Sequence, residues 1–242
     1  NVLMIVGCSA LVSPIVISKS TIHKDIPFAI LATLSLIVVS LDAVLDGGQF
    51  ENLISRTDGL MLLGLFAVFM FYTFSIARNK DGAGEQPQAL QIAPMSYGRI
   101  FLYVILGLAG LVFGGNLFVD AATEIALSMG VSETVVGLTL VAAGTSLPEL
   151  ATSIVAARKG SSAIAIGNVV GSNIFNILFV IGTAALICSV PFERKFIIDT
   201  IIAVLSGVLL WGGTIKKKEL RKPCGILMLL GYAAYFVYLC VI

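Results

Sequence analysis

The stretch AAGTSLPE, Ala142 to Glu149, places oxygen-bearing side chains and a proline inside one of the most apolar parts of the chain. Thr145 and Glu149 are four residues apart, so on a helix their side chains share one face. Pro148 has no N–H and its ring clashes with the carbonyl four residues earlier, which predicts a kink or break. Backbone carbonyls between Ala142 and Thr145 then lack helical partners. Carboxylate, hydroxyl and carbonyl oxygens are the ligands that hard cations such as Na⁺ and Ca²⁺ prefer.

A second segment, GNVVGSNIFN at Gly167–Asn176, has a similar character. Asn168, Ser172 and Asn176 are spaced by four residues, which predicts one polar stripe along a helix, with Asn173 beside it. Such a stripe could hold a cation or could hydrogen-bond one helix to the next. Both interpretations stay open for Asn168.

Two glycines of this segment, Gly167 and Gly171, form a small-xxx-small pair. In membrane proteins such pairs let a second helix backbone approach closely. The pair therefore permits another helix to approach closely at this point.

The carboxylate of Glu149 is expected to need a cationic partner. An ionised acid at the centre of a membrane helix costs about 2.5–3.5 kcal/mol, and such a residue is functional by default. The only Lys and Arg between the two polar segments lie in the turn at Arg158 and Lys159. Without a salt bridge, Glu149 is either protonated or neutralised by a bound cation.

The composition places these segments in a membrane. Of 242 residues, 58% are hydrophobic and 12% are charged, with a mean hydropathy of +1.03. Soluble domains have about 25% charged residues. The net charge of +1 gives no reason to expect a nucleic-acid partner. The four cysteines show no metal-ligand spacing, so we interpret them as small hydrophobic residues.

Eight apolar stretches are long enough to be membrane spans, since about 20 apolar residues cross the hydrocarbon core. They are Asn1–Ser18, Ile26–Leu45, Gly59–Ile76, Ile100–Val119, Val131–Ala157, Ala163–Val190, Phe196–Thr214 and Gly225–Ile242. The expected fold is therefore an all-α polytopic membrane protein.

The connections between these spans alternate between the two sides of the membrane. Twelve of the fifteen Lys and Arg residues fall on one side, which the positive-inside rule makes cytoplasmic. The rule predicts a multi-pass protein of the cell membrane with its C-terminus outside. Acidic residues such as Asp120 and Glu124 then lie on the outer side, either as ordinary solvated loops or as a negative mouth that concentrates cations.

An internal repeat relates the two halves. LMLLG occurs at Leu60–Gly64 and Leu227–Gly231, and NVLMIVGCSAL from Asn1 matches NILFVIGTAAL from Asn176. Both matches imply a repeat unit of five helices, and an odd unit places the second copy upside down. We expect ten helices in two inverted repeats, with eight present and two more preceding Asn1.

This repeat predicts three parts of the chain. Residues 1–77 hold the last three helices of the first repeat, residues 78–99 form a cytoplasmic linker, and residues 100–242 form the second five-helix repeat with the polar segments. Inverted repeats are typical of secondary transporters, whose substrate sites lie near the midplane at the repeat interface.

GLTLVAAGTSLPELATSIVAARKG followed by AIGNVVGSNIFNILFVIG resembles the second signature repeat of the calcium/cation antiporter superfamily, most closely the prokaryotic sodium/calcium exchangers. The resemblance implies ten helices and a metal site made of the following residues. Glu149 is the carboxylate shared by Ca²⁺ and Na⁺, Ala142 and Thr145 provide backbone carbonyls, and Ser146 and Ser172 provide side-chain oxygens.

Asparagines complete the set that the resemblance implies. Asn176 matches a position that some sodium/calcium exchangers fill with aspartate, and Asn1 matches its partner in the first repeat. Asn173, beside the stripe, is a further candidate ligand. Asparagine at Asn176 removes one titratable charge, which leaves the ion set and the stoichiometry open.

The expected function is secondary antiport, with Ca²⁺ moving one way and Na⁺ the other through one alternating site. A Ca²⁺/H⁺ antiporter or a K⁺-dependent Na⁺/Ca²⁺ antiporter is the alternative, and a channel or a non-transporting scaffold ranks lower. The sequence has no GxxxxGK[ST] or HExxH motif, so we expect neither an enzyme nor a bound cofactor. The expected partners are Ca²⁺, Na⁺ (or H⁺) and the lipid bilayer.

Overall fold

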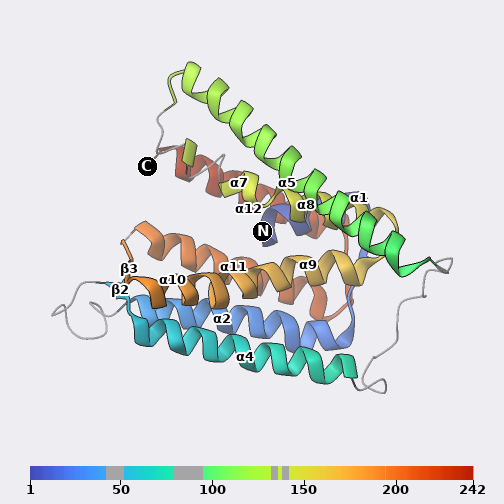
Figure 1. Cartoon of the computed structure of the whole chain (residues 1–242), viewed down its shortest axis with the longest axis horizontal. Helices are drawn as coiled ribbons and strands as arrows, with labels where there is room; N and C mark the ends of the chain where they lie inside the picture. The colour runs from blue at the N-terminus through green and yellow to red at the C-terminus, as the bar shows by residue number, and fades with distance from the viewer. Residues whose placement is uncertain (42–51, 79–94, 132–135, 138–141, 194, 242) are drawn as a thin grey trace.

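The computed structural model describes residues 1–41, 52–78, 95–131, 136–137, 142–193 and 195–241 (Figure 1). The elements before the middle of the chain are η1 Val2–Val6, α1 Gly7–Val12, β1 Ile15–Val16, η2 Thr21–Asp25, α2 Ile26–Ser40, β2 Leu53–Ile54, α4 Arg56–Arg78 and α5 Tyr97–Ser128. Those after it are α7 Ala142–Thr145, α8 Leu147–Arg158, α9 Ser162–Ile174, η5 Phe175–Ile181, α10 Gly182–Ile187, β3 Val190–Pro191, α11 Lys195–Ile215, β4 Glu219–Leu220 and α12 Lys222–Val241.

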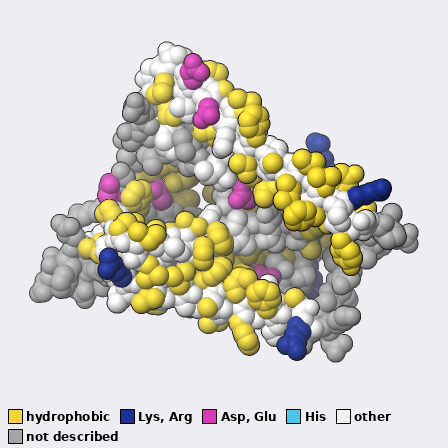
Figure 2. Space-filling model, in the orientation of Figure 1, with side chains coloured by type: hydrophobic (Ala, Val, Ile, Leu, Met, Phe, Trp, Pro, Cys, Tyr) yellow, Lys and Arg dark blue, Asp and Glu magenta, His cyan; other side chains and the backbone are white. Residues whose placement is uncertain are grey.

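The described residues include six helices that are long and apolar enough to cross a membrane. The remaining two predicted spans are different: Val2–Val12 is a shorter apolar helix, and α7 and α8 are the two pieces of a broken one. Hydrophobic side chains cover much of the surface, with Lys and Arg at its margins (Figure 2). The all-α polytopic fold is confirmed.

Several predicted helix ends were wrong. The first helix ends at Val12 and not at Ser18, because Pro14 disfavours helical backbone at Ser13, which is extended with φ −151° and ψ 143°.

The linker prediction falls mostly on residues 79–94, which lie outside the described residues.

Helix α5 is longer than predicted at its C-terminal end. It runs past Val119 to Ser128, so Asp120 and Glu124 lie on the helix and not in a loop. The helix stops where Gly130 takes a φ of +84°, and the Gly130 N–H then donates to the Leu127 carbonyl.

The inverted repeat is visible in matched irregularities. Helix α1 follows the π-helical stretch η1, and helix α10 follows the π-helical stretch η5. Each begins with a glycine, is six residues long and ends at an extended residue, Ser13 in one case and Cys188 in the other. Two independent segments would not share these local details by chance, so the structure supports the predicted pairing of Asn1 with Asn176.

Two close helix crossings repeat in the same way. A Cβ added to Gly7 would lie 3.2 Å from the Gly225 carbonyl oxygen, and one added to Gly225 would lie 3.0 Å from that of Gly7. A Cβ at Gly59 would lie 2.7 Å from the Gly182 carbonyl oxygen. Helices α1 and α12, and helices α4 and α10, therefore cross backbone to backbone.

Short strand pairs join the same helices at their ends. Antiparallel pairing places Ile15 opposite Leu220 between β1 and β4, and Ile54 opposite Val190 between β2 and β3. Each pair satisfies backbone groups where the chain leaves a helix. The sequence analysis did not predict these strands, since two residues are too few for a strand pattern.

Two tyrosine–aspartate hydrogen bonds also correspond. Asp25 is the fifth residue from the start of η2, and Asp199 is the fifth residue of α11. The Tyr72 hydroxyl donates to Asp25 Oδ1 at 3.2 Å, and the Tyr235 hydroxyl donates to Asp199 Oδ1 at 2.9 Å. Both bonds fix the start of one helix against another from the same half.

The larger of two hydrophobic core clusters among the described residues contains residues from both halves, including Ile5, Leu62, Ile166, Leu178 and Met228. Helices α2, α4, α9–α10 and α11 run side by side, while α5 crosses α8 obliquely (Figure 1). Helix α5 has no buried residue, and it contacts mainly α7 and α8. The proposed division at residues 78–99 stays a prediction.

Candidate cation site

A helix break forms the centre of the site. Helix α7 ends at Thr145, Ser146 has φ −96° and ψ 0°, and α8 starts at Leu147 with Pro148 in its first turn. Proline fits this position because the first N–H groups of a helix have no intrahelical partner. The break predicted from Pro148 is therefore confirmed.

Helix α5 packs on the break through a residue that has no side chain. A Cβ at Gly144 would collide with the Val119 side chain, so only glycine permits this contact. Ala142 is the first residue of the short helix α7, so its backbone carbonyl lies in the first turn of that helix. Thr145 is exposed and lines a cavity between α5 and the break.

Three predicted ligands are joined by hydrogen bonds. The Ser146 hydroxyl donates to Asn1 Oδ1 at 2.7 Å, and Asn1 Nδ2 donates to the Ser172 hydroxyl at 3.2 Å. Ser172 donates in turn to the Val169 carbonyl at 3.1 Å. Residues far apart in the sequence thus meet at one place, as the interface between repeats requires.

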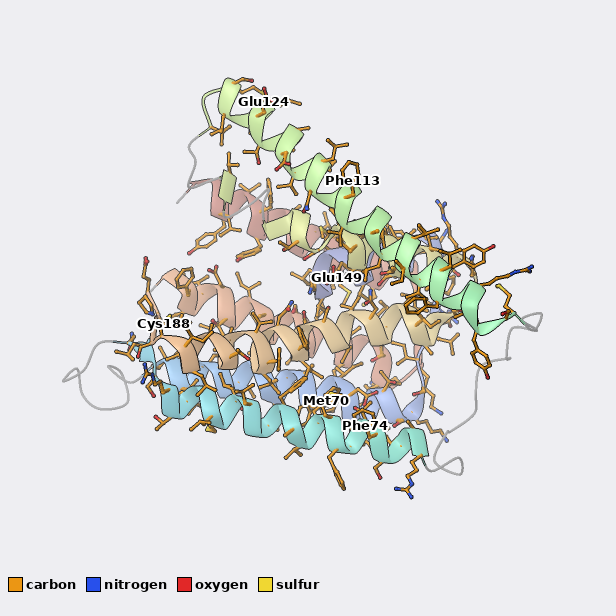
Figure 3. All side chains as sticks on the ribbon, viewed as in Figure 1. Met70, Phe74, Phe113, Glu124, Glu149 and Cys188 are labelled. Carbon is orange, nitrogen blue, oxygen red and sulfur yellow. The ribbon has the colours of Figure 1, made fainter. Side chains whose placement is uncertain are left out.

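The carboxylate of Glu149 lies in the first turn of α8, near the middle of the molecule (Figure 3). Its Oε2 atom is buried and has no hydrogen-bond partner among the described residues. Buried acceptors are normally satisfied, and one that is not calls for an explanation such as an ion. Among the described residues, no three His, Cys, Asp or Glu side chains are grouped so that they could hold a metal ion. Amide, hydroxyl and carbonyl oxygens would therefore complete any cation shell.

Asn168 has a structural role in this arrangement. Its side-chain amide lies 3.1 Å from the Glu149 carbonyl oxygen and 3.0 Å from each of the Thr152 and Ser153 hydroxyls. Of the two interpretations left open, these contacts favour the bonding of α9 to α8.

Asn173 and Asn176 make none of the hydrogen bonds that join Asn1, Ser146 and Ser172. Asn173 lines a cavity of about 200 Å³ together with Asn1 and Asp199. Asn176 is exposed and lies outside the hydrogen bonds that join Asn1, Ser146 and Ser172. The backbone changes from α- to π-helical at Phe175, and the predicted polar stripe through Asn176 stays a prediction.

No described helix makes the close approach that Gly167 and Gly171 permit. No atom of the described residues lies within 4 Å of a Cβ built at either position. The pair instead lines a cavity of about 430 Å³ together with Asp25 and Tyr72. A small-xxx-small pattern permits a close approach, but it does not show that a second helix is there.

Asn116 of α5 was not among the predicted site residues, and Asp120 was predicted only as an acid on the outer side. Asn116 and Asp120 line the same cavity as Thr145. Their spacing of four residues was the available signal, but the predicted helix end at Val119 hid it.

The fold and the site define an α-helical membrane protein with inverted repeats and a broken helix at its centre. A model of the sodium/calcium exchanger protein family matches residues 1–75 and 99–241. The chain belongs to this family.

Relatives cover most of the chain. It is 31% identical over 249 residues to the inner membrane protein YrbG of Escherichia coli strain K12, covering 99% of this chain and 73% of the relative. It is 37% identical over 190 residues to the putative antiporter CaxA of Alkalimonas amylolytica, covering 77% of this chain and 57% of the relative.

A solved structure of the sodium-calcium exchanger NCX_Mj, soaked with 100 mM Na⁺ and 10 mM Sr²⁺, has the same fold. It matches with a TM-score of 0.77 and 32% identity, covering 98% of this chain and 72% of that one. The chain thus spans between about half and three quarters of the length of these proteins.

Proposed function

We propose that the protein is a secondary antiporter that exchanges Ca²⁺ for Na⁺ by alternating access at a midplane site. The proposed ligands are the Glu149 carboxylate, the hydroxyls of Ser146 and Ser172, the side-chain amides of Asn1, Asn173 and Asn176, and backbone carbonyls at Ala142 and Thr145. Membership of the sodium/calcium exchanger family supports the substrate class. The proposal includes no enzymatic activity and no resident cofactor, because the ions are cargo.

The observation that carries the proposal is the buried, unpartnered Glu149 Oε2 beside a hydroxyl–amide network. A buried carboxylate oxygen without a hydrogen bond is costly, and a bound cation would offset that cost. Oxygen ligands of this kind suit Ca²⁺ and Na⁺. Inverted repeats joined at one polar centre are the architecture in which both membrane faces can reach the same site.

The test is Ca²⁺ uptake by proteoliposomes that contain the intact protein. An outward Na⁺ gradient should drive uptake, and Glu149→Gln should abolish it while the protein still purifies as a monodisperse species. Glu219→Gln is the matched control. Glu219 Oε2 forms an ion pair with Arg221 Nε at 2.9 Å, and neither residue is a proposed ligand. Uptake by Glu149→Gln at the wild-type rate would refute the site.

The same vesicles identify the coupling ion. Each gradient is imposed alone, first Na⁺ and then H⁺, with and without K⁺ on the opposite side. We expect uptake with Na⁺ and none with a pH gradient alone. Uptake driven by the pH gradient would replace Na⁺ with H⁺ in the proposal.

A further inference from the structure

Helix α5 is mostly apolar but carries several polar side chains along one side. Asn116, Asp120 and Thr123 follow one another at spacings of four and three residues, so they share one helix face. The Thr123 hydroxyl is buried and has no hydrogen-bond partner among the described residues. Polar groups inside a membrane helix are costly and normally serve a function.

This face borders a cavity that reaches the helix break. The cavity has a volume of about 300 Å³, and its wall includes Asn116 and Asp120 from α5 and Gly144, Thr145 and Pro148 from the break. Glu149 follows Thr145 by four residues, on the other side of the break. A cation in this cavity would therefore have left bulk water but would not yet have reached the Glu149 carboxylate.

The chemistry of the wall suits a hard cation. No described Lys or Arg forms a salt bridge with Asp120, so its negative charge is available to a mobile ion. The wall also carries the amide of Asn116 and the hydroxyl of Thr145, and these oxygens belong to the ligand class that Ca²⁺ and Na⁺ take. A negative charge in a cleft with low-dielectric walls raises the local cation concentration.

An acid in a helix that ends at the membrane surface could be no more than a solvated charge. Glu124 provides the comparison, since it lies one turn further along the same helix and is also exposed. Glu124 does not line the cavity. It lies near the far end of α5, whereas Glu149 is near the centre of the molecule (Figure 3).

We propose that Asp120, with Asn116 and Thr145, forms a transit site for Ca²⁺ or Na⁺ between one aqueous face and the helix break. Asp120 acts here as a recruiting residue that sets the affinity for ions arriving from that face. The positive-inside rule predicts that this face is external. The inference rests on the proposed antiport, because it supplies ions to the same site.

The test measures the initial rate of Ca²⁺ uptake as a function of the Ca²⁺ concentration on the membrane face at the C-terminal end of α5. Asp120→Asn should raise the half-saturating concentration roughly threefold to tenfold and leave the maximal rate nearly unchanged. The difference in half-saturating concentration between Asp120→Asn and the wild type should shrink at high ionic strength, because salt screens the Asp120 charge of the wild type. Glu124→Gln, the matched control, should leave the half-saturating concentration unchanged.

A gain-of-charge variant protects the test against misfolding. Asn116→Asp adds a second carboxylate to the same wall and should lower the half-saturating concentration about twofold to threefold. Asp120→Glu should behave like the wild type. A role of Asp120 in packing alone predicts neither the gain nor the rescue.

Equal shifts in Asp120→Asn and Glu124→Gln, or a shift in neither, would overturn the transit site. A lower maximal rate with an unchanged half-saturating concentration would overturn it as well, since Asp120 would then affect a later step. Wild-type vesicles without uptake would refute the antiport itself. Active wild type, inactive Glu149→Gln and normal Asp120→Asn would refute only the transit site.

Discussion

At the scale of single residues, the hydroxyl of Ser146 is the link between the helix break and the first half of the chain. Its bond to Asn1 Oδ1 is short, at 2.7 Å, and Asn1 continues the link to Ser172. A residue whose side chain bonds another proposed ligand controls where that ligand stands. Ser146 therefore contributes both an oxygen and the position of the Asn1 amide.

Removal of this hydroxyl should weaken cation binding without abolishing transport. A hydrogen bond of this kind contributes about 0.5–1.5 kcal/mol net, so Ser146→Ala should raise the half-saturating Ca²⁺ concentration roughly threefold to tenfold. Thr73→Ala is the control, because Thr73 is exposed on α4 and bonds only the Phe69 carbonyl of its own helix. Unchanged Ca²⁺ dependence in Ser146→Ala would remove Ser146 from the site.

Some site residues could be predicted from local sequence and others could not. Pro148 breaks its helix through its own covalent structure, so the break was visible in the sequence. The meeting of Asn1, Ser146 and Ser172 depends on how three separate segments pack. The repeat matched Asn1 to Asn176, but it could not show that only Asn1 would join the network.

At the scale of elements, the two glycine crossings hold the bundle together. Gly59 has a backbone carbonyl where a side chain would go, whereas nothing lies within 4 Å of a Cβ at Gly64, five residues later on the same helix. The two glycines therefore make opposite predictions for the same substitution.

Gly59→Ala should destabilise the protein by about 1–3 kcal/mol, because the new methyl group forces α4 and α10 apart. Gly64→Ala should be neutral or stabilising by up to about 1 kcal/mol, since alanine is the better helix former. Thermal unfolding in detergent, followed by circular dichroism, measures both. Equal melting temperatures for the two variants would contradict the crossing.

The elements also show where sequence patterns fail. Apolar runs located the spans because bilayer thickness sets their length. Helix α5 continued past Asp120 because a polar residue alone does not end a helix, and Gly130 does. The motif of Gly167 and Gly171 permits a close approach, but a local pattern contains no information about what lies opposite it.

At the scale of the whole molecule, the orientation in the membrane follows from the distribution of charge. The turn between α11 and α12 contains Lys216, Lys217 and Lys218, while Met129 directly follows the end of α5 on the opposite side in the predicted topology. Lys217 and Met129 are both exposed. They are suitable positions for a labelling experiment.

Single cysteines test this orientation in a background without the four native cysteines. In intact cells, a membrane-impermeant thiol reagent should label Met129→Cys, and it should label Lys217→Cys only after permeabilisation. The asymmetry follows from the excess of Lys and Arg on the cytoplasmic side. Labelling of both positions from outside would contradict the topology, and reversed labelling would invert it.

The glycine crossings and the strand pairs have a mechanical consequence. Helices α1 and α12 touch at Gly7 and Gly225, and a few residues away they are fastened again by β1 and β4. Helices α4 and α10 are held by the same two kinds of contact. Two bodies fastened at two separate points keep only a hinge-like freedom about the line between them. Each of these pairs contains one helix from each half of the chain. The helix pairs that can move as rigid bodies are therefore not the same units as the two sequence repeats.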